Sequence, residues 1–88
     1  MRSAAEKMMK SYLRPVPGRQ QVYFQEGRTM VIVESRQWKL SYSRHERVAF
    51  DVSDEDALFI ELNGEEKGKH CVPWQRILRL TINEGPDL

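Results

Sequence analysis

The sequence predicts a mainly β fold: a small antiparallel barrel of five to six strands with one N-terminal α-helix. Segments after residue 20 alternate apolar and polar residues, which is typical of half-buried strands. Turn signals such as Asn63-Gly64 separate these segments. A chain of 88 residues is long enough for one domain with one modest core. We therefore expect a single domain over 1–88, with a helix at 4–13 and a β-rich part at 20–83.

The helix is predicted from its boundary signals and its apolar spacing. Ser3 and Glu6 have the spacing of a capping box, in which each side chain accepts from the other residue's amide. Pro15 and Pro17-Gly18 end the helix. The apolar face that we expect to pack on the barrel consists of Ala5, Met8, Met9, Tyr12 and Leu13.

The first two strands are predicted as a hairpin. Residues 20–25 and 29–34 are rich in β-forming residues and flank a short glycine-containing loop. Alternation in the first run places Val22 and Phe24 inward and Tyr23 outward. The second run is apolar on both faces, so we expect it to be central in the sheet.

Three further strands are predicted at 38–43, 48–52 and 58–62, because apolar residues alternate there. Ser53 is expected to N-cap a turn after the second of them. The residues expected to face inward on the first and third of these strands are Trp38, Leu40, Tyr42, Leu58, Ile60 and Leu62.

The last segment is interrupted by Pro73. Proline has no amide to donate, so the chain should kink after a short stretch at 70–72 and resume as a closing strand at 76–82. On that strand we expect Leu78, Leu80 and Ile82 inward, and Arg79, Thr81 and Asn83 outward. One helix and five or six strands fit an SH3-like or Sm-like barrel; an OB-type barrel, or an open sheet crossed by the helix, is the alternative.

Composition narrows the class of protein. Apolar residues make up 40% and charged residues 31%, which is ordinary for a globular protein. The single cysteine, Cys71, excludes an internal disulfide and fits a reducing compartment. No apolar run approaches the ~18 residues of a membrane-spanning helix, and the first residues lack the uninterrupted apolar stretch of a secretory signal. We therefore expect a cytoplasmic protein that is not associated with a membrane.

The net charge of +1 is the sum of two opposite halves. Residues 1–47 hold ten Lys and Arg against four Asp and Glu, which gives +6; residues 48–88 hold four against nine, which gives −5. Such a split either forms one basic face that suits a polyanion, or cancels through pairing between neighbouring strands.

The sequence carries no catalytic or metal signature. His45 and His70 are 25 residues apart, and Cys71 should point away from its neighbour His70 on a strand. Zinc needs three or four converging ligands, and a nucleophile needs a base and an oxyanion hole. We therefore expect a non-enzymatic domain without a cofactor or metal, in which Cys71 is a packing residue.

Two functions remain open. The one that we expect is protein–protein interaction or homo-oligomer assembly, which includes a regulatory role; the other is its alternative. The second is binding of single-stranded RNA or DNA, because Tyr23 and Phe59 fall on outward faces near basic residues, and stacking beside a basic groove is how such strands are bound. The candidate binding residues for a nucleic acid or a partner are Tyr23, Arg28, Arg36, Lys39, Arg44 and Arg79.

Two resemblances add to this interpretation. The run Val72-Pro73-Trp74-Gln75-Arg76-Ile77-Leu78-Arg79-Leu80 resembles the ending of small uncharacterised prokaryotic domains, in which a histidine often stands where this chain has Gln75. The order of a helix followed by a barrel resembles Sm-like RNA-binding proteins. That resemblance implies ring assembly through edge strands and RNA binding, although the chain lacks the glycine-anchored Sm signature and an Asn/Asp pair for a base pocket.

Overall fold

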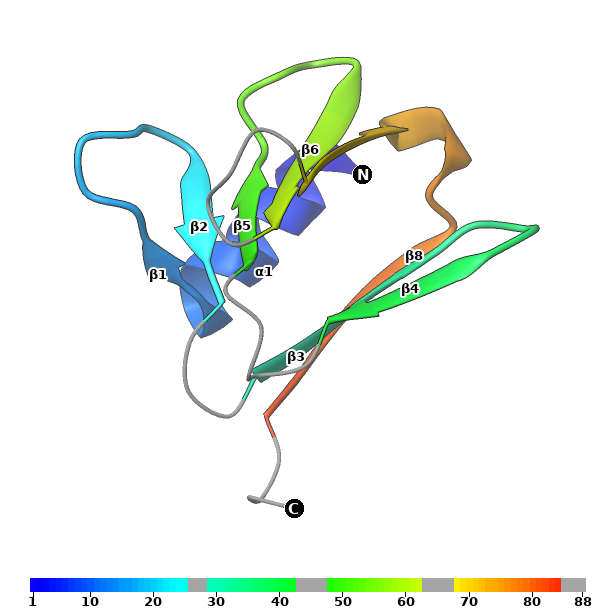
Figure 1. Cartoon of the computed structure of the whole chain (residues 1–88), viewed down its shortest axis with the longest axis horizontal. Helices are drawn as coiled ribbons and strands as arrows, with labels where there is room; N and C mark the ends of the chain where they lie inside the picture. Colours follow the sequence, from blue (N-terminus) through cyan, green and yellow to red (C-terminus); the bar gives the residue numbers. More distant parts are fainter. Residues whose placement is uncertain (26–28, 43–47, 63–67, 85–88) are drawn as a thin grey trace.

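The computed structural model describes residues 1–25, 29–42, 48–62 and 68–84. These residues form one N-terminal helix and eight strands in two antiparallel sheets (Figure 1). The elements follow in the order α1 (Arg2–Tyr12), β1 (Arg14–Pro15), β2 (Val22–Phe24), β3 (Thr29–Glu34), β4 (Lys39–Tyr42), β5 (Val48–Asp51), β6 (Ala57–Leu62), β7 (Lys69–Pro73), the 3₁₀ helix η2 (Trp74–Arg76) and β8 (Arg79–Glu84).

The first sheet has the strand order β1-β2-β5-β6-β7, and the second has the order β4-β3-β8. The mainly β prediction with one helix is confirmed, and β3 is central in its sheet as expected. Two strands, β1 and β7, bring the number above the predicted five or six. In the described ranges the hydrogen-bonded ladders form two separate sheets and do not close into one barrel.

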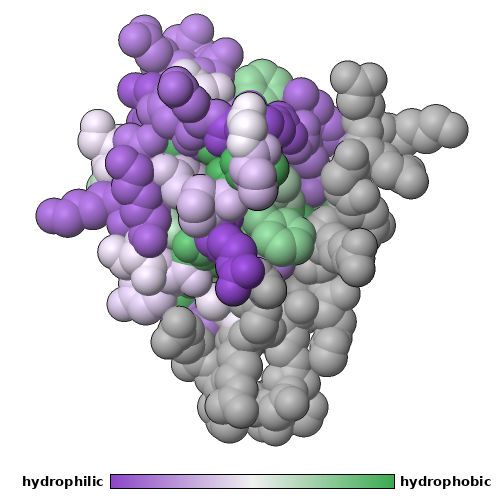
Figure 2. All heavy atoms as spheres, turned by 90° about the vertical axis from the view of Figure 1, so that its left-hand side faces the viewer, coloured by the Kyte–Doolittle hydropathy of each residue, from purple (hydrophilic) through white to green (hydrophobic). Residues whose placement is uncertain are grey.

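The core lies between the inner faces of the two sheets. In the second sheet Val33 pairs with Leu40 on one side and Leu80 on the other, so the three side chains form one inward row. Fully buried side chains of the core include Met9, Val31, Val33, Val48, Phe50, Val52, Leu58 and Ile60. Seen from the side of β1 and β2, the described surface is largely hydrophilic, and apolar residues show only as small areas (Figure 2).

Tyr23 faces the core, so the predicted outward orientation is wrong. The register pairs Tyr23 with Phe50 and Phe50 with Ile60, and directly opposite residues share a face of the sheet. Tyr23 is only 4% exposed, and burial raises the pKa of its hydroxyl group, with a smaller contribution from Glu6. Val22 is also buried, on the opposite face, so alternation of apolar residues could not tell the two faces apart.

The helix packs on the core through one face, as predicted, but this face contains one residue fewer than expected. Ala5 and Met9 are buried in α1, and Leu13 is buried directly after it, with Met8 partly buried beside them. Tyr12 was expected on this face and is instead 46% exposed. In Figure 1 the helix lies behind β2 and β5.

The start of the helix differs from the predicted capping box. Met1 is the N-cap residue, and no side chain caps the helix. Glu6 instead accepts a hydrogen bond of 2.9 Å from the Gln21 side-chain amide, which ties the helix to the connection between β1 and β2. The predicted partner, Ser3, is exposed within the first turn.

The turn after β5 is held by aspartates rather than by the predicted N-cap Ser53. The Asp51 carboxylate accepts from the Ser53 amide and hydroxyl at 2.9 and 2.6 Å. The Asp54 carboxylate accepts from the amides of Asp56 and Ala57 at 2.7 and 3.2 Å. The four-atom aspartate side chain reaches the amides two and three residues ahead and so fixes the turn.

The predicted kink after Pro73 is confirmed, and it changes which leucine is buried. β7 ends at Pro73, η2 follows, and β8 starts only at Arg79. Because the chain is still turning before Arg79, Ile77 takes the buried position, and Leu78 is 56% exposed instead of inward. Leu80 and Ile82 are buried as predicted.

Candidate nucleic-acid interface

An open hollow of about 510 Å³ lies where the turn between β3 and β4 meets the segment around η2. Both segments lie on the right-hand side of the molecule in Figure 1, although they are far apart in the sequence. The lining residues are Ser35, Arg36, Gln37, Gln75, Arg76 and Leu78. Five of these six side chains are polar and two carry a positive charge, which indicates a site for a polar, anionic ligand.

The first wall is a tight turn that Ser35 holds in place. Its hydroxyl oxygen accepts hydrogen bonds from the backbone amides of Gln37 and Trp38 at 3.2 and 3.1 Å. The Ser35 amide donates in turn to the Trp38 carbonyl at 2.9 Å. Arg36 and Gln37 are therefore presented to solvent on a fixed backbone, and both are exposed.

The second wall is anchored by Trp74. Its indole N–H donates to the Asp54 carbonyl at 2.9 Å, and its backbone amide donates to the Asp56 carbonyl at 3.0 Å. Trp74 itself is buried, so the next two residues, Gln75 and Arg76, start from a fixed point and are exposed. A site on two anchored walls loses little conformational freedom when it binds a ligand.

A backbone hydrogen bond joins the two walls. The Leu78 amide donates to the carbonyl of Glu34, the last residue of β3, at 2.8 Å. This bond fixes the segment that follows η2 beside the start of the β3–β4 turn. It also fixes where the exposed Leu78 side chain begins.

Further cations lie beside the hollow, on the outer face of the second sheet. Glu34 pairs with Lys39 on β4 and with Arg79 on β8, so the three side chains form one row across the sheet. Lys39 and Arg79 are both exposed. We call these two residues, together with Arg36 and Arg76 of the hollow, the basic end.

The structure brings together three of the six predicted binding residues. Arg36, Lys39 and Arg79 all belong to the basic end. Tyr23 does not belong to it, because its ring is buried in the core and cannot stack on a base. Arg28 and Arg44 lie outside the described residues.

Five of the six lining residues were not predicted from the sequence: Ser35, Gln37, Gln75, Arg76 and Leu78. The available signal was Pro73, because residues after a kink leave the sheet and can point to solvent. Nothing in the sequence showed that this kink would lie against the turn at 35–38. That contact depends on the pairing of β8 with β3.

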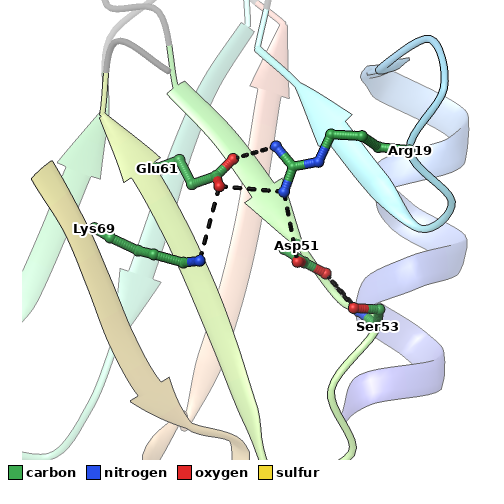
Figure 3. Close-up of polar contacts among 5 residues, drawn as sticks. All are labelled: Arg19, Asp51, Ser53, Glu61 and Lys69. Carbon is green, nitrogen blue, oxygen red and sulfur yellow. Dashed lines mark hydrogen bonds and ion pairs between the residues drawn. The ribbon is translucent and has the colours of Figure 1, made fainter. Parts of the chain in front are cut away.

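A second charged cluster lies on the outer face of the first sheet (Figure 3). Arg19 binds Glu61 with two hydrogen bonds, of 2.7 and 3.1 Å, and lies 3.8 Å from Asp51. Lys69 lies 3.9 Å from Glu61 and stands over the ring of Phe59 at 5.2 Å. The charges satisfy one another and partly cover Phe59, so we interpret this cluster as a clamp and not as a binding site.

The clamp holds the connection between β1 and β2 against the sheet. The hydrogen bonds to Glu61 raise the pKa of Arg19, and the nearby carboxylate charges add to the effect, so the guanidinium stays charged. The side chain of Glu61 is only 10% exposed, whereas that of Arg19 is 44% exposed. Water can solvate Arg19 more easily than Glu61, so loss of the pair would cost the carboxylate more free energy than the guanidinium.

Replacing Arg19 should destabilise the fold without affecting the basic end. Arg19→Ala leaves the mostly buried Glu61 carboxylate without its two-fold partner, and we expect a loss of about 1–2 kcal/mol in the free energy of unfolding, moderated by water reaching the site. Urea denaturation measures this loss. Arg19→Lys keeps the charge but not the two-fold hydrogen-bond geometry, so its free energy of unfolding should lie between those of the wild type and Arg19→Ala. An unchanged midpoint for Arg19→Ala would show that the clamp contributes nothing.

No three His, Cys, Asp or Glu residues in the described ranges are placed to hold a metal ion. Of the helices in the described part of the chain, none has the length and apolar character needed to span a membrane.

No family model, no curated protein and no solved structure matches this chain. Cys71, expected to be a packing residue, is exposed on β7.

Proposed function

We propose that this chain is a non-enzymatic binding domain whose ligand is single-stranded RNA or DNA, contacted at the basic end. The observation that carries the proposal is that Arg36 and Arg76, from separate segments, line one open hollow. Guanidinium groups are planar, always charged and matched to the geometry of phosphate oxygens. Two of them in one hollow therefore suit a phosphate group.

The neighbouring residues support a strand rather than a single phosphate. Lys39 and Arg79 lie in the next row of the sheet, beside the hollow, where they can contact the phosphates that flank the first one. A single strand can also turn a nucleotide into the hollow, whereas a duplex keeps its bases stacked and paired. We therefore expect a single strand to bind more tightly than a duplex of the same sequence.

A titration with a labelled oligonucleotide at several salt concentrations tests this proposal. If all four cations of the basic end contact phosphates, the slope of log K against log salt should be about −3 for a single strand. Fluorescence anisotropy measures it. No binding at low salt, or a slope near zero, would contradict the proposal. Tighter binding of the duplex would redirect it to double-stranded nucleic acid.

The second candidate is a protein partner or a second copy of the chain, favoured by the edge strand β7. β7 pairs only with β6 in the described residues, and four of its five residues are exposed. Such an edge can accept a strand from a partner. Lys69 and Pro73 at its two ends are residue types that hinder this addition, and for this reason we place nucleic acid first.

Light scattering separates the two candidates. Self-association predicts a mass of at least twice 10.4 kDa without any nucleic acid. The first proposal predicts binding by the monomer. The SH3-like or Sm-like barrel and the cytoplasmic location stay predictions, whichever of the two functions holds.

A further inference from the structure

We propose that the hollow holds one complete nucleotide unit, with its phosphate at Arg36 and Arg76 and its base against Leu78. This inference rests on the proposed function and makes it more specific. It predicts that the domain distinguishes a base-bearing strand from other polyanions of the same charge.

Leu78 is the first reason. It is 56% exposed, more than any other large apolar side chain in the described ranges. Its backbone is fixed by the 2.8 Å bond to Glu34, so the side chain stays at the hollow. An aliphatic surface in the same hollow as two guanidinium groups adds nothing to the binding of a simple anion. It does complement the apolar face of a base, whose removal from water is favourable.

Gln37 and Gln75 are the second reason. They line the hollow from opposite walls, and each carboxamide carries both hydrogen-bond donors and an acceptor. An ionised phosphate only accepts hydrogen bonds from the protein, so it would not use the amide oxygens. The edge of an unpaired base offers donors as well as acceptors, and single-stranded bases are bound through these edges. Charge, apolar surface and mixed hydrogen bonding thus fit one nucleotide.

The test compares two single strands of equal length and equal backbone charge, one with bases and one built of abasic units. At a fixed low salt concentration, the wild-type protein should bind the abasic strand roughly tenfold more weakly, which corresponds to the apolar contact of one nucleotide. Leu78→Ser should lower the affinity for the base-bearing strand to nearly that of the abasic strand and leave the abasic affinity unchanged.

Met30→Ser is the matched control. Met30 is also an exposed apolar residue, at 40%, but it lies at the opposite end of β3 from the hollow. This variant should bind both strands as the wild type does. Thermal melting should show that both variants remain folded, because both side chains are largely exposed.

Three outcomes overturn the inference. Equal wild-type affinity for the two strands would leave polyanion binding intact but remove the nucleotide subsite. Loss of affinity for both strands in Leu78→Ser would show that Leu78 supports the site without contacting a base. Failure of the wild type to bind either strand would overturn this inference together with the proposed function.

Discussion

Leu80→Asp should unfold the domain. Leu80 is 6% exposed and lies on β8, opposite Val33, in the inward row that joins the second sheet to the core. The substitution removes packing worth about 2–5 kcal/mol and also places a carboxylate in the apolar core. A domain of this size has only about 5–15 kcal/mol of stability to lose. Far-ultraviolet circular dichroism should show loss of the β signal at room temperature.

Arg79→Asp is the control for this prediction, because it adds the same side chain one residue earlier on the same strand. Arg79 is exposed on the outer face, so the variant should stay folded while its affinity for a single strand falls. If both variants fold, or both unfold, the alternation of inward and outward residues on β8 is wrong.

Met9→Ala should cost about 2–5 kcal/mol of unfolding free energy. Met9 is 0% exposed and is the residue of α1 most deeply placed in the core. Truncation leaves a cavity between the helix and the sheets, because the surrounding strands can only partly relax. Urea denaturation followed by tryptophan fluorescence measures the change.

Tyr12→Ala provides the comparison within the same helix. Tyr12 is 46% exposed, so its loss should change the stability by less than about 1 kcal/mol. A midpoint for Met9→Ala that equals the wild-type value would show that α1 is not an integral part of the core.

Much of the fold could be predicted because a strand with one buried face shows alternating apolar and polar residues in its sequence. Leu80 and Ile82 on β8 are buried at every second residue, as expected. The prediction failed where both faces of a strand are covered. β2 has Val22 and Tyr23 buried on opposite faces, so only the pairing with β5 decides which of them faces the core.

The site was harder to predict than the fold because it is made by tertiary contact. Arg36, Lys39 and Arg79 were found from charge alone, and they do gather at one end. Arg76 was missed, since its position depends on η2 packing through Trp74 onto the Asp54–Asp56 turn. Local sequence patterns describe strands and turns, but not which two turns meet.

We expect the basic end, and not positive charge in general, to bind a single strand. The double variant Arg36→Glu/Arg76→Glu tests it against Lys7→Glu/Lys10→Glu, which makes the same charge change at exposed positions of α1. In an anisotropy titration with one single-stranded oligonucleotide at low salt, the first variant should bind about tenfold more weakly, or worse, and the second close to wild type. Equal weakening by the two variants, or no weakening by the first, would show that the basic end is not the binding site.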